Sequence, residues 1–327
     1  MSIRTSDFSS VTAYLDEIVN EATVDKVAGM KEADMLFDTD VYVRKDYIYR
    51  ILHGVKGVAL VPEGSDLPRA TGLQGDAITF TQAKYGVQVP ITKEMRLFDQ
   101  YDEMGSIVRS VVEDGLDKID QSLADVLLNG HATTAYTDVY GQSVTPVGPD
   151  GDALFGTHSN GATSSTFSNL VVNSAGSTNV ALSRDAVIAT RVKGLTYQDV
   201  NGLTRPVTLD TLIVAPSNED LAERTLFSTQ IPGEANNDIN ALKGKIKKLL
   251  VWSRLETRGS DGTDTSNRWY MADSKNVKKT LKAKFAQKPT FAAPTQHDNN
   301  MDWQYNYDYL MFKGFGFAPF IYGSSIS

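Results

Sequence analysis

The side chains best suited to chemistry in this sequence are four histidines, His53, His131, His158 and His297, because the chain holds no cysteine. No two of the histidines share the H-x-x-x-H or H-E-x-x-H spacing of a zinc site. His158 has a notable context, since it follows Asp150 in the segment DGDALFGTHSN. An aspartate–histidine pair can activate a nucleophile, but a structural hydrogen-bonding role is the one that we predict for His158.

Other catalytic and cofactor-binding motifs are absent from the sequence. It contains no G-x-S-x-G turn, no G-x-G-x-x-G after a predicted strand and no G-x-x-x-x-G-K-[ST] phosphate loop. Neighbouring carboxylates such as Glu113 and Asp114 fall on the polar face of a predicted helix, where we expect solvation or salt bridges. We therefore predict no catalytic, cofactor-binding or metal-binding residue, and a protein that is not an enzyme.

A long amphipathic helix is the element around which the chain is organised. Between residues 102 and 129, apolar residues recur at three- and four-residue spacing, which predicts one apolar stripe along a helix of about 40 Å. The residues expected to pack this stripe against the body are Val108, Val112, Leu116, Ile119 and Leu123. Taken alone, the same pattern also suits a long core helix of an ordinary α/β domain.

An extended β-hairpin with a large loop is predicted before this helix. Residues 41–61 are rich in strand-forming types, and apolar residues alternate through 78–91 with a change of parity between Phe80 and Tyr85 that predicts a bulge or bend. The Pro- and Gly-rich tract 62–76 is much longer than the usual hairpin loop of about two to five residues. A two-stranded ribbon is marginally stable alone in water, so we expect the hairpin to lie on a partner surface; a surface loop without a partner is the alternative. The predicted contact residues to another subunit are Pro62, Glu63, Leu67, Arg69 and Leu73.

The remaining segments predict a mixed body of helices and strands. Residues 1–36 read as an amphipathic arm too short for a core of its own, and the Gly-, Ser-, Thr- and Asn-rich residues 131–180 predict irregular structure with short strands. A helix over 183–192 has Ser183 as its N-cap, and a helix through 221–227 begins after a cap at Ser217 or Asn218. The predicted strands are 209–214, 244–252, 268–272 and the aromatic segment 303–322.

Composition limits the class of protein. With 327 residues, of which 41% are apolar and 22% charged, the chain has the composition of a globular protein with one or two domains. It shows no long apolar run and no N-terminal signal pattern, so we expect neither a membrane span nor a cleaved export signal. Without cysteine there are no disulfides or thiolate metal sites, and stability must come from packing or assembly.

The net charge of −8 is unevenly distributed. Residues 1–160 hold 25 Asp and Glu against 13 Lys and Arg, whereas the remainder holds 15 against 19. Halves of opposite sign suit head-to-tail contact between copies, although uneven solvated charge on a monomer gives the same pattern. An acidic chain argues against tight wrapping by nucleic acid, and the basic segment 275–288 is expected to contact water or an acidic neighbour more readily than phosphate.

The order of these segments resembles that of the HK97-fold major capsid proteins of tailed bacteriophages, and more specifically the Mu-type major head subunit family. The resemblance covers nearly the whole chain, and it rests on the order of packing patterns rather than on chemical signatures. The segments that carry it are Glu63-Gly64, Tyr85 to Met95, Asp99 to Asp102, Asp150-Gly151 with Leu154, Phe155 and His158, Asp210 to Pro216, Leu221 to Leu226, and Arg268 to Asp273.

This resemblance implies an α+β capsid fold. Its parts would be an N-terminal arm (1–36), an extended loop or E-loop with its base (37–92), a peripheral P-domain holding the long helix (93–185), an axial A-domain (186–290) and closing strands that return to the P-domain (291–327). Some relatives cross-link their subunits through Lys and Asn, but no motif assigns such a pair here.

The function that the resemblance implies is self-assembly into the hexamers and pentamers of an icosahedral shell around double-stranded DNA. The expected place is the virion capsid, assembled in the host cytoplasm. Expected partners are further copies of the chain, a portal at one vertex, a decoration protein, and DNA through weak non-specific contact, with no membrane. A separate scaffolding protein is also expected, because the long helix begins near residue 102 and the cleaved scaffolding region of the family has no counterpart here.

Three other functions fit parts of the sequence. An encapsulin-like compartment, which holds cargo protein instead of DNA, has the same implied architecture. A soluble hydrolase would use His158 and Asp150. A monomeric carbohydrate- or surface-binding module would use the Ser-, Thr- and Gly-rich residues 131–180. The oligomeric state separates these alternatives, since only a shell or ring former gives assemblies larger than a monomer.

Overall fold

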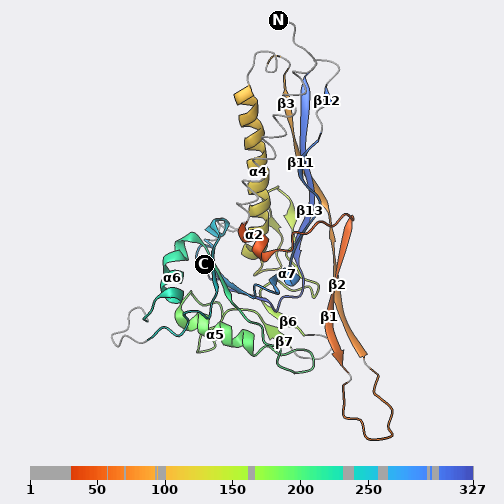
Figure 1. Cartoon of the computed structure of the whole chain (residues 1–327), viewed down its shortest axis with the longest axis vertical. Coiled ribbons are helices and arrows are strands. Elements are labelled where there is room, and N and C mark those ends of the chain that lie inside the picture. Colours follow the sequence, from red (N-terminus) through yellow and green to blue (C-terminus); the bar gives the residue numbers. More distant parts are fainter. Residues whose placement is uncertain are drawn as a thin grey trace.

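The chain folds as an α+β protein with three visible parts (Figure 1). One long helix stands beside long antiparallel strands, a body of shorter elements lies below them, and a two-stranded hairpin projects away from the body. The arm predicted over 1–36 lies outside the described residues except for its end, which forms helix α2 (Lys31–Leu36). The computed structural model describes residues 31–56, 58–69, 71–92, 94, 101–160, 166–230, 239–256, 264–292, 295–296 and 302–326.

The long helix is α4 (Tyr101–Leu128), which confirms the helix predicted over 102–129. Its polar face carries exposed residues such as Glu113 and Asp114. Each predicted stripe residue is at most 2% exposed, because the stripe faces the sheet and the body. These residues are Val108, Val112, Leu116, Ile119 and Leu123.

A sheet of long strands runs alongside α4. Its central strand β13 (Trp303–Phe315) pairs antiparallel with β3 (Ala83–Ile91) on one side and with β11 (Leu281–Phe291) and the short β12 (Thr295–Gln296) on the other. Gly115 of α4 leaves room for the Tyr307 ring, since a Cβ there would lie 2.5 Å from Tyr307 Cε1. Helix and sheet therefore approach closely enough to form one core.

The projecting hairpin consists of β1 (Asp46–Lys56) and β2 (Thr71–Thr81), paired antiparallel from Asp46–Thr81 at the base to Lys56–Thr71 at the far end. The hairpin and the change of direction predicted between Phe80 and Tyr85 are confirmed, because the second strand breaks at Gln82 and continues as β3 on β13.

The predicted bounds of the hairpin strands were wrong at the loop. The first strand ends at Lys56 rather than continuing to residue 61, and β2 begins at Thr71, inside the tract 62–76 that was predicted as loop. Glycine explains part of this error, because it is depleted in strands generally but here makes room for a neighbour. A Cβ at Gly75 would lie 2.5 Å from the His53 ring across the hairpin.

Aromatic stacking fixes the base of the hairpin to the long sheet. The rings of Tyr47 and Phe80 each stack on Phe312 of β13 at 5.3 Å between centroids. Gly314 and Gly316, at the end of β13 and just beyond it, leave space for the hairpin rings, since a Cβ at either would overlap Phe80 or Tyr49. The hairpin thus leaves the body in a defined direction.

Gly314→Ala is expected to displace the Phe80 ring and weaken this attachment. Overpacking of this kind costs about 1–3 kcal/mol, so the free energy of unfolding in urea should fall by about that amount. Gly156→Ala is the matched control, because a Cβ at Gly156 has nothing within 4 Å. Equal stability of the two variants would contradict the proposed close fit between β13 and the hairpin.

The body is built on a second sheet with strand order β14-β10-β8-β9, in which β8 and β9 are parallel and the other pairs antiparallel. The strands at 209–214 and 268–272 are confirmed in slightly shorter form, but 244–252 is a strand only from Lys248, because residues 241–245 form turns with Gly244 at a φ of 81°. The strands are β8 (Thr211–Val214), β9 (Lys248–Val251), β10 (Trp269–Ala272) and β14 (Ile321–Gly323).

Helices and short elements surround this sheet. Ser183 caps α5 (Arg184–Leu195) as predicted, with its hydroxyl accepting a hydrogen bond from the Ala186 N–H. Asn218 occupies the cap position of α6 (Glu219–Phe227) but makes no side-chain cap bond. The described part of 131–180 is irregular with short strands, as predicted. The short elements are β4 (Tyr136–Thr137), β5 (Ser143–Val144), β6 (Thr157–Ser159), β7 (Thr166–Ser168), η2 (Pro216–Asn218), η3 (Ser253–Glu256) and α7 (Val277–Thr280).

The division into five parts stays a prediction, although the strand pairing bears on one boundary. β11 falls almost entirely within the predicted axial part, 186–290, yet it pairs with β13 in the long sheet. Two Lys side chains hold β11 to the segment after α2, since Lys282 and Lys284 both bond Asp38.

Candidate assembly surfaces

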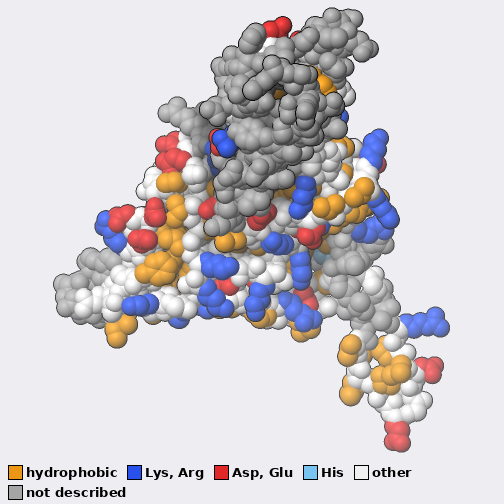
Figure 2. Space-filling view, turned by 45° about the horizontal axis from the view of Figure 1, so that its top comes forward, with side chains coloured by type: hydrophobic (Ala, Val, Ile, Leu, Met, Phe, Trp, Pro, Cys, Tyr) orange, Lys and Arg blue, Asp and Glu red, His pale blue; other side chains and the backbone are white. Residues whose placement is uncertain are grey.

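The loop of the β1–β2 hairpin exposes apolar side chains that no described part of the chain covers. Val58, Leu60 and Leu67 have relative exposures of 107%, 97% and 81%. The loop has local order, because the Ser65 N–H donates to the Pro62 carbonyl at 3.1 Å and Gly64 takes a φ of 82°. Figure 2 shows hydrophobic side chains gathered at this projecting end, away from the body.

Four of the five predicted contact residues lie exposed in this loop: Pro62, Glu63, Leu67 and Arg69. Leu73 lies in β2 opposite Gly54, and its side chain is outside the described residues. Sequence reasoning missed Val58 and Leu60, which it assigned to a strand. The available signal was the position of the apolar run 58–61, directly before Pro62 and the Pro- and Gly-rich tract.

Partly and fully buried ion pairs connect the elements next to the hairpin base. Lys282 and Lys284 lie 2.8 and 2.6 Å from the Asp38 carboxylate. Burial raises the pKa of Asp38, but the hydrogen bonds and charges of these two lysines outweigh it and lower the pKa to about 2. On the opposite side of the sheet, Lys313 of β13 lies 2.9 Å from Asp138, with side-chain exposures of 7% and 1%.

A third buried carboxylate joins the long helix to the body. Asp120 of α4 accepts hydrogen bonds from the Trp252 indole N–H at 3.2 Å and from Arg254 Nε at 3.1 Å. Burial raises the pKa of Asp120 above its ordinary value despite these bonds. The hairpin loop therefore projects from a body whose elements are held together by packing and by paired charges.

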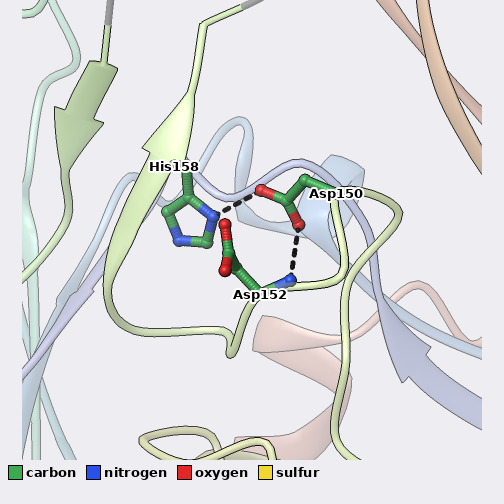
Figure 3. Close-up of side chains that lie close together, drawn as sticks. All are labelled: Asp150, Asp152 and His158. Carbon is green, nitrogen blue, oxygen red and sulfur yellow. Dashed lines mark hydrogen bonds and ion pairs between the residues drawn. The ribbon is translucent and has the colours of Figure 1, made fainter.

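Among the described residues, the Asp150–His158 pair has the side-chain types best suited to catalysis or metal binding. Figure 3 shows this pair with Asp152 alongside. His158 Nδ1 lies 2.8 Å from Asp150 Oδ2, and its Nε2 lies 3.2 Å from the Leu154 carbonyl oxygen. Burial raises the pKa of Asp150, but the hydrogen bond and charge of His158 bring it below the ordinary value. The His158 ring also stacks on Phe167 at 5.2 Å.

Both ring nitrogens of His158 thus lie within hydrogen-bond distance of oxygen atoms of the protein. A general base needs a nitrogen aimed at a nucleophile, whereas the two nitrogens of His158 face oxygen atoms of Asp150 and Leu154. With its side chain 3% exposed, His158 instead ties the loop at Asp150 to the loop at Leu154. This geometry confirms the structural hydrogen-bonding role predicted from the sequence.

His131, just after α4, is buried in a different way. Neither ring nitrogen has a hydrogen-bond partner, although part of the residue reaches the surface. The ring stacks between Phe155 at 4.6 Å and Tyr270 at 6.2 Å. Burial, with a smaller contribution from the nearby Arg268 charge, lowers its pKa to about 3. His131 therefore packs as a neutral aromatic ring.

This environment predicts acid sensitivity. The pKa of His131 is lower in the folded state than its ordinary value of 6.5, so the unfolded state binds the proton more readily and stability is lost as pH falls from 6.5 towards 3. His131→Phe should remove this contribution, which is about 1.4 kcal/mol per pH unit in that window. The measurement is the difference in unfolding free energy between wild type and variant across the pH range. A constant difference would show that His131 does not titrate in this way.

The helices of the described residues do not include one that is both long enough and apolar enough to span a membrane. Their longest member, α4, carries acidic and basic residues along its polar face.

Comparison with known proteins assigns the chain to a family. The family model described as "Phage capsid protein" matches residues 76–316, which is most of the chain. No curated protein sequence matches it.

Solved capsid structures share the fold at low identity. The capsid chain of an empty GTA particle is 10% identical with a TM-score of 0.55, and 90% of this chain covers 89% of that chain. The capsid chain of cyanophage P-SCSP1u is 12% identical with a TM-score of 0.54, covering 88% and 86% of the two chains. At these identities the likeness shows the HK97-like fold, and the family match shows the lineage. The chain belongs to the phage capsid protein family and is a structural subunit of a phage capsid.

Proposed function

We propose that this chain is the major head subunit, which assembles with copies of itself into the hexamers and pentamers of an icosahedral shell around double-stranded DNA. The observation that supports the proposal best is the hairpin loop with Val58, Leu60 and Leu67 exposed. An isolated hairpin with apolar side chains at its end has no means of burying them on its own body. A neighbouring subunit provides the missing surface.

The geometry of such a contact suits ring closure. The hairpin of one copy would meet a different surface on the next, so the contact is heterologous, and repeated rotation closes it into a ring. A stable protein interface buries on the order of 1,600 Å² in total, more than a few loop residues supply. We therefore infer that the sides of the body, including the exposed part of α4, add to the contact made by the loop.

The finer assignments follow from the sequence resemblance. They include the Mu-type subfamily, a scaffolding protein, a portal, a decoration protein and assembly in the host cytoplasm. The contacts that both His158 nitrogens make within the protein support a structural role for this histidine.

The proposal is tested with the purified protein at a concentration high enough for assembly. Size-exclusion chromatography with light scattering should give capsomers or larger particles, and electron microscopy should show closed shells. A population of compact monomers at all concentrations and salt conditions would overturn the proposal. Shells that retain protein cargo and exclude DNA when both are supplied would favour a compartment of the encapsulin kind.

A further inference from the structure

Seven exposed lysines gather at one end of the body sheet, and we name this surface the lysine face. They come from two segments: the turn before β9 together with the first residue of β9, and the turn that contains α7. The members of the lysine face are Lys243, Lys245, Lys247, Lys248, Lys275, Lys278 and Lys279.

Strand register brings the two segments together. β8 and β9 run parallel with Thr211 opposite Lys248, and β10 runs antiparallel with Ala272 opposite Thr211. The start of β9 and the end of β10 therefore lie at the same end of the sheet. Asp210 joins them directly, because its carbonyl accepts from the Lys247 N–H at 2.8 Å while its carboxylate accepts from the Ser274 N–H at 2.9 Å and hydroxyl at 2.8 Å.

Two carboxylates at this end of the sheet, Asp210 and Asp273, are buried and make no ion pair with the lysines. Asp210 is 4% exposed and Asp273 is 5% exposed. Asp210 is occupied by Ser274, and Asp273 by the Asn276 side chain and the Lys275 N–H. Among the described residues, no ion pair involves a member of the lysine face.

The polar contacts of these lysines are to neutral groups. Lys243 Nζ donates to the Thr229 hydroxyl at 3.1 Å, and Lys279 Nζ donates to the Asn276 side-chain oxygen at 2.8 Å. Lys279 also lies over the Phe320 ring at 5.8 Å. The lysine face therefore keeps its positive charge.

The apolar residues between these lysines point inward. Leu242, Ile246 and Val277 are at most 3% exposed. Between the lysines, these two segments therefore expose no apolar side chain that a protein partner could bury. Protein interfaces are enriched in aromatic residues and Arg, and depleted in Lys. Phosphate contact without base reading needs only positive charge, which flexible Lys side chains supply.

We propose that the lysine face binds the phosphate backbone of double-stranded DNA without sequence preference, and thus faces the interior of the shell. This inference rests on the proposed shell function and assigns its DNA contact to one surface. The contact is weak and local, because the chain as a whole carries a net charge of −8. It assigns to phosphate a segment, 275–279, that sequence alone favoured as a contact for water or acidic protein.

The test uses full-length capsomers and a short fluorescent DNA duplex, with affinity measured by anisotropy across a range of salt concentrations. One variant replaces Lys243, Lys245, Lys247 and Lys248 with Gln, and a second replaces Lys275, Lys278 and Lys279. Each variant should bind DNA more weakly. The negative slope of log affinity against log salt should become shallower by about 0.9 for each phosphate that the missing lysines had neutralised. The matched control replaces four lysines outside the lysine face: Lys45, Lys84, Lys118 and Lys288.

Thermal unfolding and electron microscopy accompany the binding measurement. Variants of the lysine face that fold, form shells and bind DNA more weakly, while the control binds normally, would support the proposal. Equal DNA affinity and salt slope in the lysine-face and control variants would overturn it, as would wild-type capsomers that bind no duplex. Lysine-face variants that bind DNA normally but form no shells would instead assign the lysine face to an acidic protein surface. Failure of the wild type to form shells overturns the shell function separately, whatever the DNA affinity.

Discussion

A double variant with Leu60→Asp and Leu67→Asp is expected to remain folded as a free subunit and to form no shells. Both side chains are more than 80% exposed in the free subunit, so their replacement removes nothing from its own core. In a shell, each new carboxylate would be buried in an apolar contact without a partner, which is strongly unfavourable. Truncation of a hot-spot residue in an interface costs about 2 kcal/mol or more. Repeated around a ring, this suffices to prevent assembly.

Light scattering and electron microscopy measure the assembly, and urea unfolding measures the stability of the free subunit. The control is Leu203→Asp, which makes the same chemical change at a leucine that is 58% exposed in a turn of the body. This control should assemble as the wild type does. Shells formed at normal yield by the loop variant would show that the hairpin loop is not an assembly contact.

The elements that sequence predicted well are those specified by local pattern. The apolar stripe of α4 needs only its own spacing, and Ser183 caps α5 through a bond to Ala186, three residues away. The hairpin was also predicted, because alternation marks a half-buried strand wherever its partner lies. These features depend on residues close together in the chain.

The features that sequence missed depend on distant partners. β11 carries Lys282, a residue type that is rarely buried, and it lies in a core only because Asp38 pairs with it. The start of β2 at Thr71 depends on pairing with Lys56 across the loop. No local pattern contains that information.

The candidate surfaces divide in the same way. The loop could be proposed from its length and its lack of a partner, but Val58 and Leu60 read as strand because local propensity cannot distinguish an apolar run inside a sheet from one in solvent. The lysine face could not be identified from sequence, since its two segments are separated along the chain and meet only through strand register and Asp210. The role of His158 was predicted because its partners, Asp150 and Leu154, are local in the chain.

Lys313→Met is expected to lower the free energy of unfolding by about 3–5 kcal/mol, because it leaves the carboxylate of Asp138 buried and unpaired. Asp138 is 1% exposed at its side chain. Its Oδ1 accepts from the Tyr140 and Gln142 N–H groups at 3.0 and 2.9 Å, while its Oδ2 depends on Lys313. Two backbone bonds cannot replace the missing cation.

Asp138→Asn combined with Lys313→Met removes both charges. The double variant should recover much of the lost stability, because no unpaired charge is then left buried. The matched control is Lys84→Met, whose partner Asp308 lies at 3.0 Å in a pair where the lysine side chain is 68% exposed. Exposed pairs contribute about 1 kcal/mol or less, so the control should be nearly neutral in urea unfolding. Lys313 follows Phe312, on which the hairpin rings stack, and we therefore expect Lys313→Met to reduce shell yield as well. If Lys313→Met cost no more than Lys84→Met, the pair between Lys313 and Asp138 would not stabilise the folded subunit.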